Sequence, residues 1–126
     1  MIEEDVTVYR SARAFPPDES EYVPAANQPG RVIRGRTHSK RASRGLSVFT
    51  TAQAVDMNLK RFPKLGSYIV RYHIPRGCTL TLMHLVGIPE HLTILGDDML
   101  ELATYLDESW WRHVSSAAEG GDEHHG

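Results

Sequence analysis

The chain has a single cysteine, Cys78, so it can form neither an internal disulfide nor a cysteine metal cluster. It also has no apolar run of the roughly 18 residues that a membrane-spanning helix needs. No basic segment followed by an apolar one opens the chain, so an ordinary secretory signal is not visible. We therefore expect a cytoplasmic protein without a membrane partner, and export by a machinery that reads no cleaved signal stays open.

An excess of one charge is missing as well, because 14 lysines and arginines stand against 16 acids and the formal net charge is -2. This balance argues against a general polyanion binder. The 126 residues, of which 40% are hydrophobic, suffice for one domain with a sizeable core. We expect a single domain over residues 1–116 and a disordered polar tail over 117–126, whose histidines form no metal site.

One segment, residues 31–44, is strongly basic and has neither acids nor interleaved aromatics. It could bind the phosphates of a nucleotide or of a nucleic acid. It could equally be a solvated loop whose charge serves solubility. Its six cations, of the 14 in the chain, are Arg31, Arg34, Arg36, Lys40, Arg41 and Arg44.

Short alternating segments dominate the rest and predict an α+β fold with mainly antiparallel sheet and flanking helices. Strands are expected over residues 5–10, 46–50, 67–74, 79–86 and 90–95, and a long loop over 15–30. The short turn at residues 75–77 predicts that the strands beside it pair antiparallel. Apolar spacing predicts helices over 51–62, capped by Thr50 or Thr51, and over 99–114, where Trp110 and Trp111 are interpreted as packing residues.

Three polar residues lie on or beside these strands in positions that suit a ligand cleft. Arg10 shares a strand side with two valines, so it either reaches solvent at the strand end or projects into a cleft to hold an anion. Ser47 could brace a ligand, and a carboxylate at Glu90 could accept from a ribose hydroxyl and stabilise a developing cation. Together they suit cleavage of a glycosidic C–N bond at a ribose.

The order of several short motifs resembles the layout of ADP-ribosyltransferase-fold proteins, most closely small bacterial toxins such as type VI secretion effectors and toxin–antitoxin toxins. The motifs are Val8-Tyr9-Arg10, Gly45-Leu46-Ser47-Val48-Phe49, Tyr68-Ile69-Val70 leading to Ile74-Pro75, and Glu90-His91-Leu92-Thr93-Ile94-Leu95. The likeness covers most of residues 6–114. It implies an ADP-ribosyltransferase-like fold, NAD as substrate, and a protein or nucleic-acid target, with an immunity or antitoxin protein as partner.

In that family an arginine or histidine on the first strand binds NAD, a serine-centred segment shapes the nicotinamide pocket, and a late glutamate is catalytic. The matching positions here are Arg10, Ser47 with its neighbours Phe49 and Thr50, and Glu90. The chain departs from the family pattern because Ile88 stands where a further acid would precede Glu90. His91 is therefore a second catalytic candidate.

Three functions remain open at this point. The first is a toxin-like enzyme that transfers ADP-ribose or cleaves NAD without modifying a target. The second is a nucleic-acid-binding or RNA-cleaving protein that uses residues 31–44 with His38. The third is a non-enzymatic partner-binding module that uses the expected helix near Trp110 and Trp111.

Overall fold

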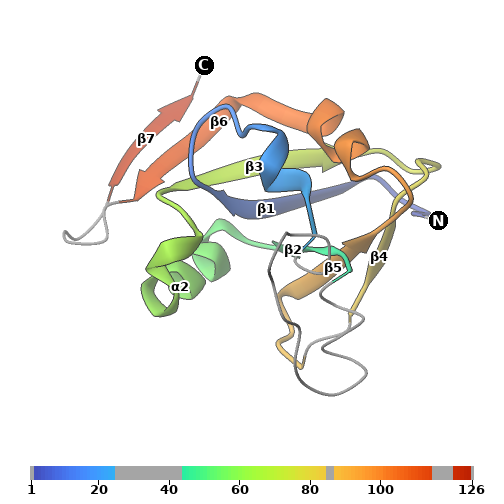
Figure 1. Cartoon of the computed structure of the whole chain (residues 1–126), viewed down its shortest axis with the longest axis horizontal. Helices are drawn as coiled ribbons and strands as arrows, with labels where there is room; N and C mark the ends of the chain where they lie inside the picture. Colours follow the sequence, from blue (N-terminus) through green and yellow to red (C-terminus); the bar gives the residue numbers. More distant parts are fainter. Residues whose placement is uncertain (1, 25–43, 85–86, 115–120, 126) are drawn as a thin grey trace.

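The computed structural model describes residues 2–24, 44–84, 87–114 and 121–125. Within these ranges the chain is an α+β domain built on an antiparallel sheet, so the expected α+β class with mainly antiparallel sheet is confirmed (Figure 1). No helix of the described residues is both long and apolar enough to cross a membrane. The elements in chain order are β1 (Val6–Ala12), η1 (Glu19–Tyr22), β2 (Leu46–Phe49), α2 (Ala52–Arg61), η3 (Pro63–Leu65), β3 (Tyr68–Ile74), β4 (Thr81–Met83), β5 (His91–Leu95), η4 (Met99–Tyr105), β6 (Leu106–Val114) and β7 (Gly121–His125).

The sheet is divided at one place. Its strand order is β4-β5-β2-β1-β3-β6-β7 over the described residues. β1 and β3 pair along seven residues each, whereas β1 and β2 share the single pair Tyr9 with Phe49. Ladder hydrogen bonds are what hold neighbouring strands side by side. Beyond Tyr9 and Phe49 the two portions of the sheet are therefore free to diverge, and Figure 1 shows β4 and β5 turned away from β1 and β3.

Alternation of side chains gives the sheet two buried faces. Tyr22 of η1 and Leu102 of η4 cover the larger core, in which Val8, Val48 and Tyr72 are fully buried. On the opposite face α2 covers a smaller core and lies below the ends of β1 and β3 at the left of Figure 1. This second core consists of Phe49, Val55, Leu59, Ile69 and Trp110.

Helix α2 forms where the sequence predicts it. Thr51 has extended backbone angles and its side chain accepts a hydrogen bond from the backbone N–H of Ala54, at 3.1 Å, so it is the N-cap. The helix ends at Arg61, one residue before the position that Pro63 restricts. Val55 and Leu59, four residues apart, are its buried contacts with the sheet.

The predicted antiparallel pair of the strands on either side of residues 75–77 is wrong. β3 pairs with β1 on one edge and with β6 on the other, and β4 pairs with β5. The turn is tied to the start of the chain instead, because Gly77 donates its N–H to the carbonyl of Ile2 and Arg76 donates to the Asp5 carboxylate. With both edges of β3 occupied, β4 has no free edge of β3 to join.

The predicted helix over residues 99–114 is also wrong. Residues 99–105 form the 3-10 helix η4, and residues 106–114 form β6. The Asp107 carboxylate accepts hydrogen bonds from the backbone N–H and the hydroxyl of Ser109, a local arrangement that competes with helical hydrogen bonding. Trp110 is 7% exposed in the smaller core and Trp111 stacks on Phe15, so both tryptophans pack as expected although they lie on a strand.

Three further segments differ from the expected ones. Of the expected strand over 79–86, the described residues form a strand at β4 (Thr81–Met83) only, and the described part of the loop over 15–30 contains η1. Of the segment expected as a disordered tail, the structure describes residues 121–125, whose backbone pairs with β6 as β7. Pairing of this kind needs only backbone groups and an open strand edge, so a polar composition does not prevent it.

Candidate functional site

Two adjoining hollows lie beside β2, one between β1 and β2 and the other between α2 and the segment that leads into β5. We call them the arginine hollow, about 390 Å³, which includes Arg10, and the glutamate hollow, about 550 Å³, which includes Glu90. Both volumes are in the range of small-molecule sites. Phe49, Asn58 and Ile88 line both hollows, so these side chains form their common wall.

Arg10 reaches the arginine hollow from β1. Its alternation with Val8 places it on the face of the larger core, where its charge acts on the hydroxyls of Tyr72 and Tyr22. Its Nη1 atom is buried and has no hydrogen-bond partner among the described residues. Burial is the main cause that raises the pKa of Tyr72, so this neighbour stays neutral and does not compensate the guanidinium. Arg10 therefore lines the hollow as a cation that hydrogen-bonds to the hydroxyl of Tyr72 and keeps one buried nitrogen without a partner among the described residues.

β2 and β5 supply two further polar residues of the arginine hollow, Ser47 and His91. Ser47 faces Thr93 and Phe49 faces His91 in the ladder between these strands, so the four side chains share one face. Ser47 is exposed, whereas the Oγ1 atom of Thr93 is buried and has no partner in the part of the chain that the structure describes. This row places one accessible hydroxyl next to a buried one.

His91 is 7% exposed and its Nδ1 atom has no hydrogen-bond partner among the described residues. Its ring meets the ring of Phe49 edge to face, with 5.1 Å between the two ring centres. Burial and, secondly, the nearby His84 lower its pKa, so the imidazole is neutral at pH 7. A neutral ring with a free nitrogen can donate to or accept from a ligand, according to its tautomer.

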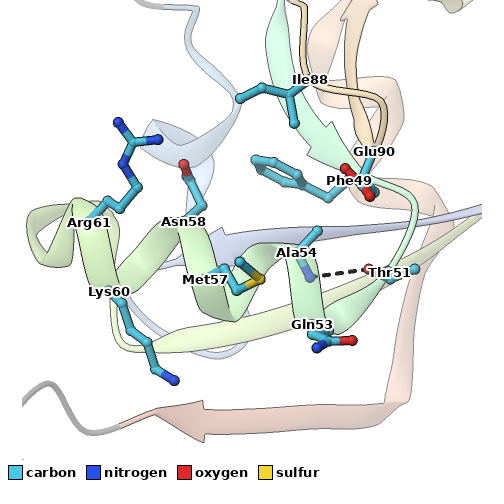
Figure 2. Close-up of a pocket in the computed structure, with 10 residues that line it drawn as sticks. All are labelled: Phe49, Thr51, Gln53, Ala54, Met57, Asn58, Lys60, Arg61, Ile88 and Glu90. Carbon is cyan, nitrogen blue, oxygen red and sulfur yellow. Dashed lines mark hydrogen bonds between the residues drawn. The ribbon is translucent and has the colours of Figure 1, made fainter.

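Glu90 lines the glutamate hollow and is exposed (Figure 2). Figure 2 shows its carboxylate beside Phe49, with Ile88 on the other side of the ring and Asn58 facing it from α2. The backbone of Glu90 is anchored because its carbonyl accepts from the N–H of Thr50 at 2.9 Å. The backbone at Glu90 is therefore fixed, and its exposed side chain lines the glutamate hollow.

The structure brings together four of the six residues that the sequence analysis assigned to the site. Arg10, Ser47, Phe49 and His91 line the arginine hollow, and Glu90 lines the glutamate hollow beside it. Thr50 lines neither of them, and its contribution is the backbone bond to Glu90.

Two contributions to the site were not predicted from the sequence, one from α2 and one from η1 with the segment before it. Asn58 of α2 presents its amide to both hollows. The sequence signal for it was its position four residues after Ala54, which places the two side chains on the same face of the helix. Glu21, 6% exposed, binds Arg13 through both the backbone N–H, at 2.6 Å, and the guanidinium, at 3.6 Å. This pair closes one side of the arginine hollow, and nothing in the sequence indicates it.

A second polar cluster joins β1, β3 and β6 away from these hollows. The Oδ2 atom of Asp107 accepts from Nε and Nη2 of Arg71, at 2.9 and 2.6 Å, and lies 2.7 Å from Nε2 of His73. The Nδ1 atom of His73 lies 3.0 Å from the hydroxyl of Thr7. Burial favours the neutral acid, but the hydrogen bonds from Ser109, Arg71 and His73 outweigh it and hold the pKa of Asp107 far below its ordinary value.

The described residues offer no metal site, and most of the basic segment lies outside them. No group of three or more His, Cys, Asp or Glu side chains in the described ranges could hold a metal ion. The basic segment lies outside the described residues except for Arg44, so its expected role in binding nucleic acid remains a prediction. Comparison of the chain with known protein families, with curated proteins and with solved structures finds no match, so the site has to be interpreted from its own geometry.

Proposed function

We propose that this protein binds NAD across the two hollows and breaks the bond between nicotinamide and its ribose, as an ADP-ribosyltransferase-like toxin would. The observation that carries the proposal is Arg10, which lines the arginine hollow and whose buried Nη1 atom has no hydrogen-bond partner among the described residues. A guanidinium in such a position prefers a phosphate oxygen, because its planar donors match phosphate geometry. The Glu90 carboxylate stands at the rim of the adjoining hollow, behind the shared side chain of Phe49.

The roles of the residues follow from this placement. Arg10 holds the pyrophosphate, Ser47 braces the nicotinamide ribose, and Phe49 offers an aromatic face to the nicotinamide ring. Glu90 accepts a hydrogen bond from a ribose hydroxyl and stabilises the positive charge that develops on the ribose. His91, neutral at pH 7, supplies one hydrogen bond from the floor of the arginine hollow.

The reaction balances without a further cofactor. The glycosidic C–N bond breaks and its electron pair leaves with nicotinamide. An oxygen or nitrogen nucleophile forms the new bond to the ribose carbon and loses its proton to Glu90 or to solvent. Water as nucleophile gives hydrolysis of NAD, and a group on a protein or nucleic acid gives transfer.

Incubation of the purified chain with NAD, followed by chromatographic measurement of nicotinamide, tests the proposal directly. In Glu90→Gln we expect a fall in kcat of about 100-fold or more, with NAD still bound, because the charge that stabilises the transition state is lost while the shape is kept. Glu108→Gln is the matched control, since Glu108 is exposed on β6. Equal rates in these two variants would remove Glu90 from the mechanism.

Arg10→Met keeps much of the volume of the side chain and removes its charge. We expect NAD to bind about 10- to 100-fold more weakly, the equivalent of a charge-assisted contact of about 1.5–3 kcal/mol. Arg76→Met, at an exposed arginine in the turn after β3, is the control. Calorimetry that detects no NAD binding by the wild-type chain, together with no nicotinamide release in the presence of a cell lysate, would refute the proposal.

A further inference from the structure

The exposed apolar side chains of this protein gather around the candidate site. Of the six large hydrophobic residues that are exposed in the described ranges, five line the two hollows. The sixth, Leu100, lies on η4 and lines neither of them. Single exposed apolar residues need no explanation, but a group that rims one concave region marks a binding surface. We call this group the apolar rim: Val23, Met57, Phe62, Leu65 and Ile88.

At the end of α2 and along η3, cationic residues alternate in the sequence with residues of the apolar rim. Residues 60–65, at the end of α2 and along η3, are all exposed and include Lys60, Arg61 and Lys64 without any acid. Asp56 pairs with Lys60 at 3.4 Å, which leaves Arg61 and Lys64 as the stronger charges. The guanidinium of Arg61 lies 5.4 Å from the centre of the Phe62 ring, so this cation is held against the rim.

From this surface we infer a binding site for an acidic segment of a partner protein, whose apolar side chains enter the rim and whose carboxylates meet residues 60–65. The charge complementarity comes from Arg61 and Lys64, and the apolar contact from a rim that includes Met57 and Phe62, two residue types that interfaces favour. If the proposed function holds, this partner is the acceptor of ADP-ribose, and that identification rests on the proposed function. The binding of the acidic segment to this surface does not depend on the proposed function.

A protein segment fits better than the other polyanionic partners. Single-stranded nucleic acid binds through stacking on several aromatic rings, whereas Phe62 is the only aromatic residue of the rim and Arg61 already covers it. An anionic membrane takes a protruding apolar surface, whereas this rim encloses two hollows with the Glu90 carboxylate in one of them. Side chains of a partner protein can enter such a concave rim.

The test uses the full chain without NAD and a fluorescently labelled random copolymer of glutamate and tyrosine as the acidic, apolar probe. We expect saturable binding by anisotropy, and at least tenfold weaker binding of polyglutamate, which has no apolar side chains. Leu65→Ser and Lys64→Glu should each weaken binding of the copolymer about tenfold, as loss of one interface contact does. The matched controls are Leu100→Ser and Arg76→Glu, which should change it less than twofold.

Several results would overturn the inference. An equal loss of copolymer affinity in Leu65→Ser and Leu100→Ser would show nonspecific binding to exposed apolar side chains. Circular dichroism of each variant shows whether it is folded. Tighter binding of polyuridylate, or of phosphatidylserine vesicles, than of the copolymer would assign the surface to nucleic acid or membrane instead. NAD hydrolysis by Lys64→Glu, measured separately, should match the wild type, so failure of the binding surface and failure of the proposed reaction are distinguishable.

Discussion

Replacement of Asp107 by asparagine tests how strongly one carboxylate holds β3 to β6. Its Oδ2 atom accepts both hydrogen bonds from Arg71, and its side chain is 11% exposed, against 26% for Arg71. Hydrogen bonds to a charged group are worth about 1.5–3 kcal/mol each. Asparagine keeps one acceptor, and water can reach Arg71 in part. We therefore expect Asp107→Asn to lower the free energy of unfolding by about 2–3 kcal/mol at pH 7.

The same change has a pH dependence whose sign follows from the lowered pKa of Asp107. A carboxyl with a lower pKa in the folded state adds stability above its unfolded pKa and loses it as the pH falls toward its folded pKa. At pH 3 an unfolded aspartate, with a pKa of about 3.9, is mostly protonated, so the advantage of the wild type should shrink by about 1.3 kcal/mol. The asparagine variant cannot titrate at this position.

Urea unfolding at pH 7 and pH 3, followed by tryptophan fluorescence, measures both effects. Asp97→Asn, at an exposed aspartate after β5, is the control and should stay within about 0.5 kcal/mol of the wild type. A loss under 0.5 kcal/mol in Asp107→Asn at pH 7 would refute the importance of the cluster. A difference that is the same at both pH values would refute the assignment of the effect to the ionised carboxylate.

Two other substitutions probe the packing around the site. In Gly45→Ala the new Cβ would clash with the carbonyl oxygen of Ile94, so we expect a loss of about 2–3 kcal/mol in urea unfolding. Gly87→Ala, whose new Cβ would have no atom of the described residues within 4 Å, should be neutral, and equal effects in the two variants would contradict the reasoning. Tyr72→Phe leaves the buried hydroxyl of Tyr22 without its partner at 3.0 Å and should lower the thermal midpoint, with a loss of about 1–2 kcal/mol; an unchanged midpoint would mean that water replaces the bond.

Local signals located several elements correctly. The alternation around Val8 and around Val70, and the apolar spacing closed by Pro63, correspond to β1, β3 and α2. These predictions succeed because the period of the side chains, a hydroxyl at an N-cap and a proline act over a few residues. In the structure the alternation along β2 puts Ser47 and Phe49 on one face, and both line the arginine hollow.

Signals that depend on distant partners failed. The spacing of Leu100, Leu106 and Trp110 is helical, yet the free edge of β3 takes residues 106–114 as β6. Such competition between a local preference and a partner strand is decided by tertiary contacts. The unpartnered nitrogen of Arg10 was equally out of reach, because burial of one atom depends on the packing of η1 and β3 around it.

By itself the sequence determined the α+β class, the cap and end of α2, and the residue types that could form a nucleotide site, since these depend on neighbours in the chain. Only the tertiary structure decided which strands pair, that β1 and β2 part after one residue pair, and that the apolar rim encircles the two hollows. The physical reason is that strand edges, cavities and exposed patches are made by segments that lie far apart in the sequence. Their interaction energies exist only once these segments are in contact.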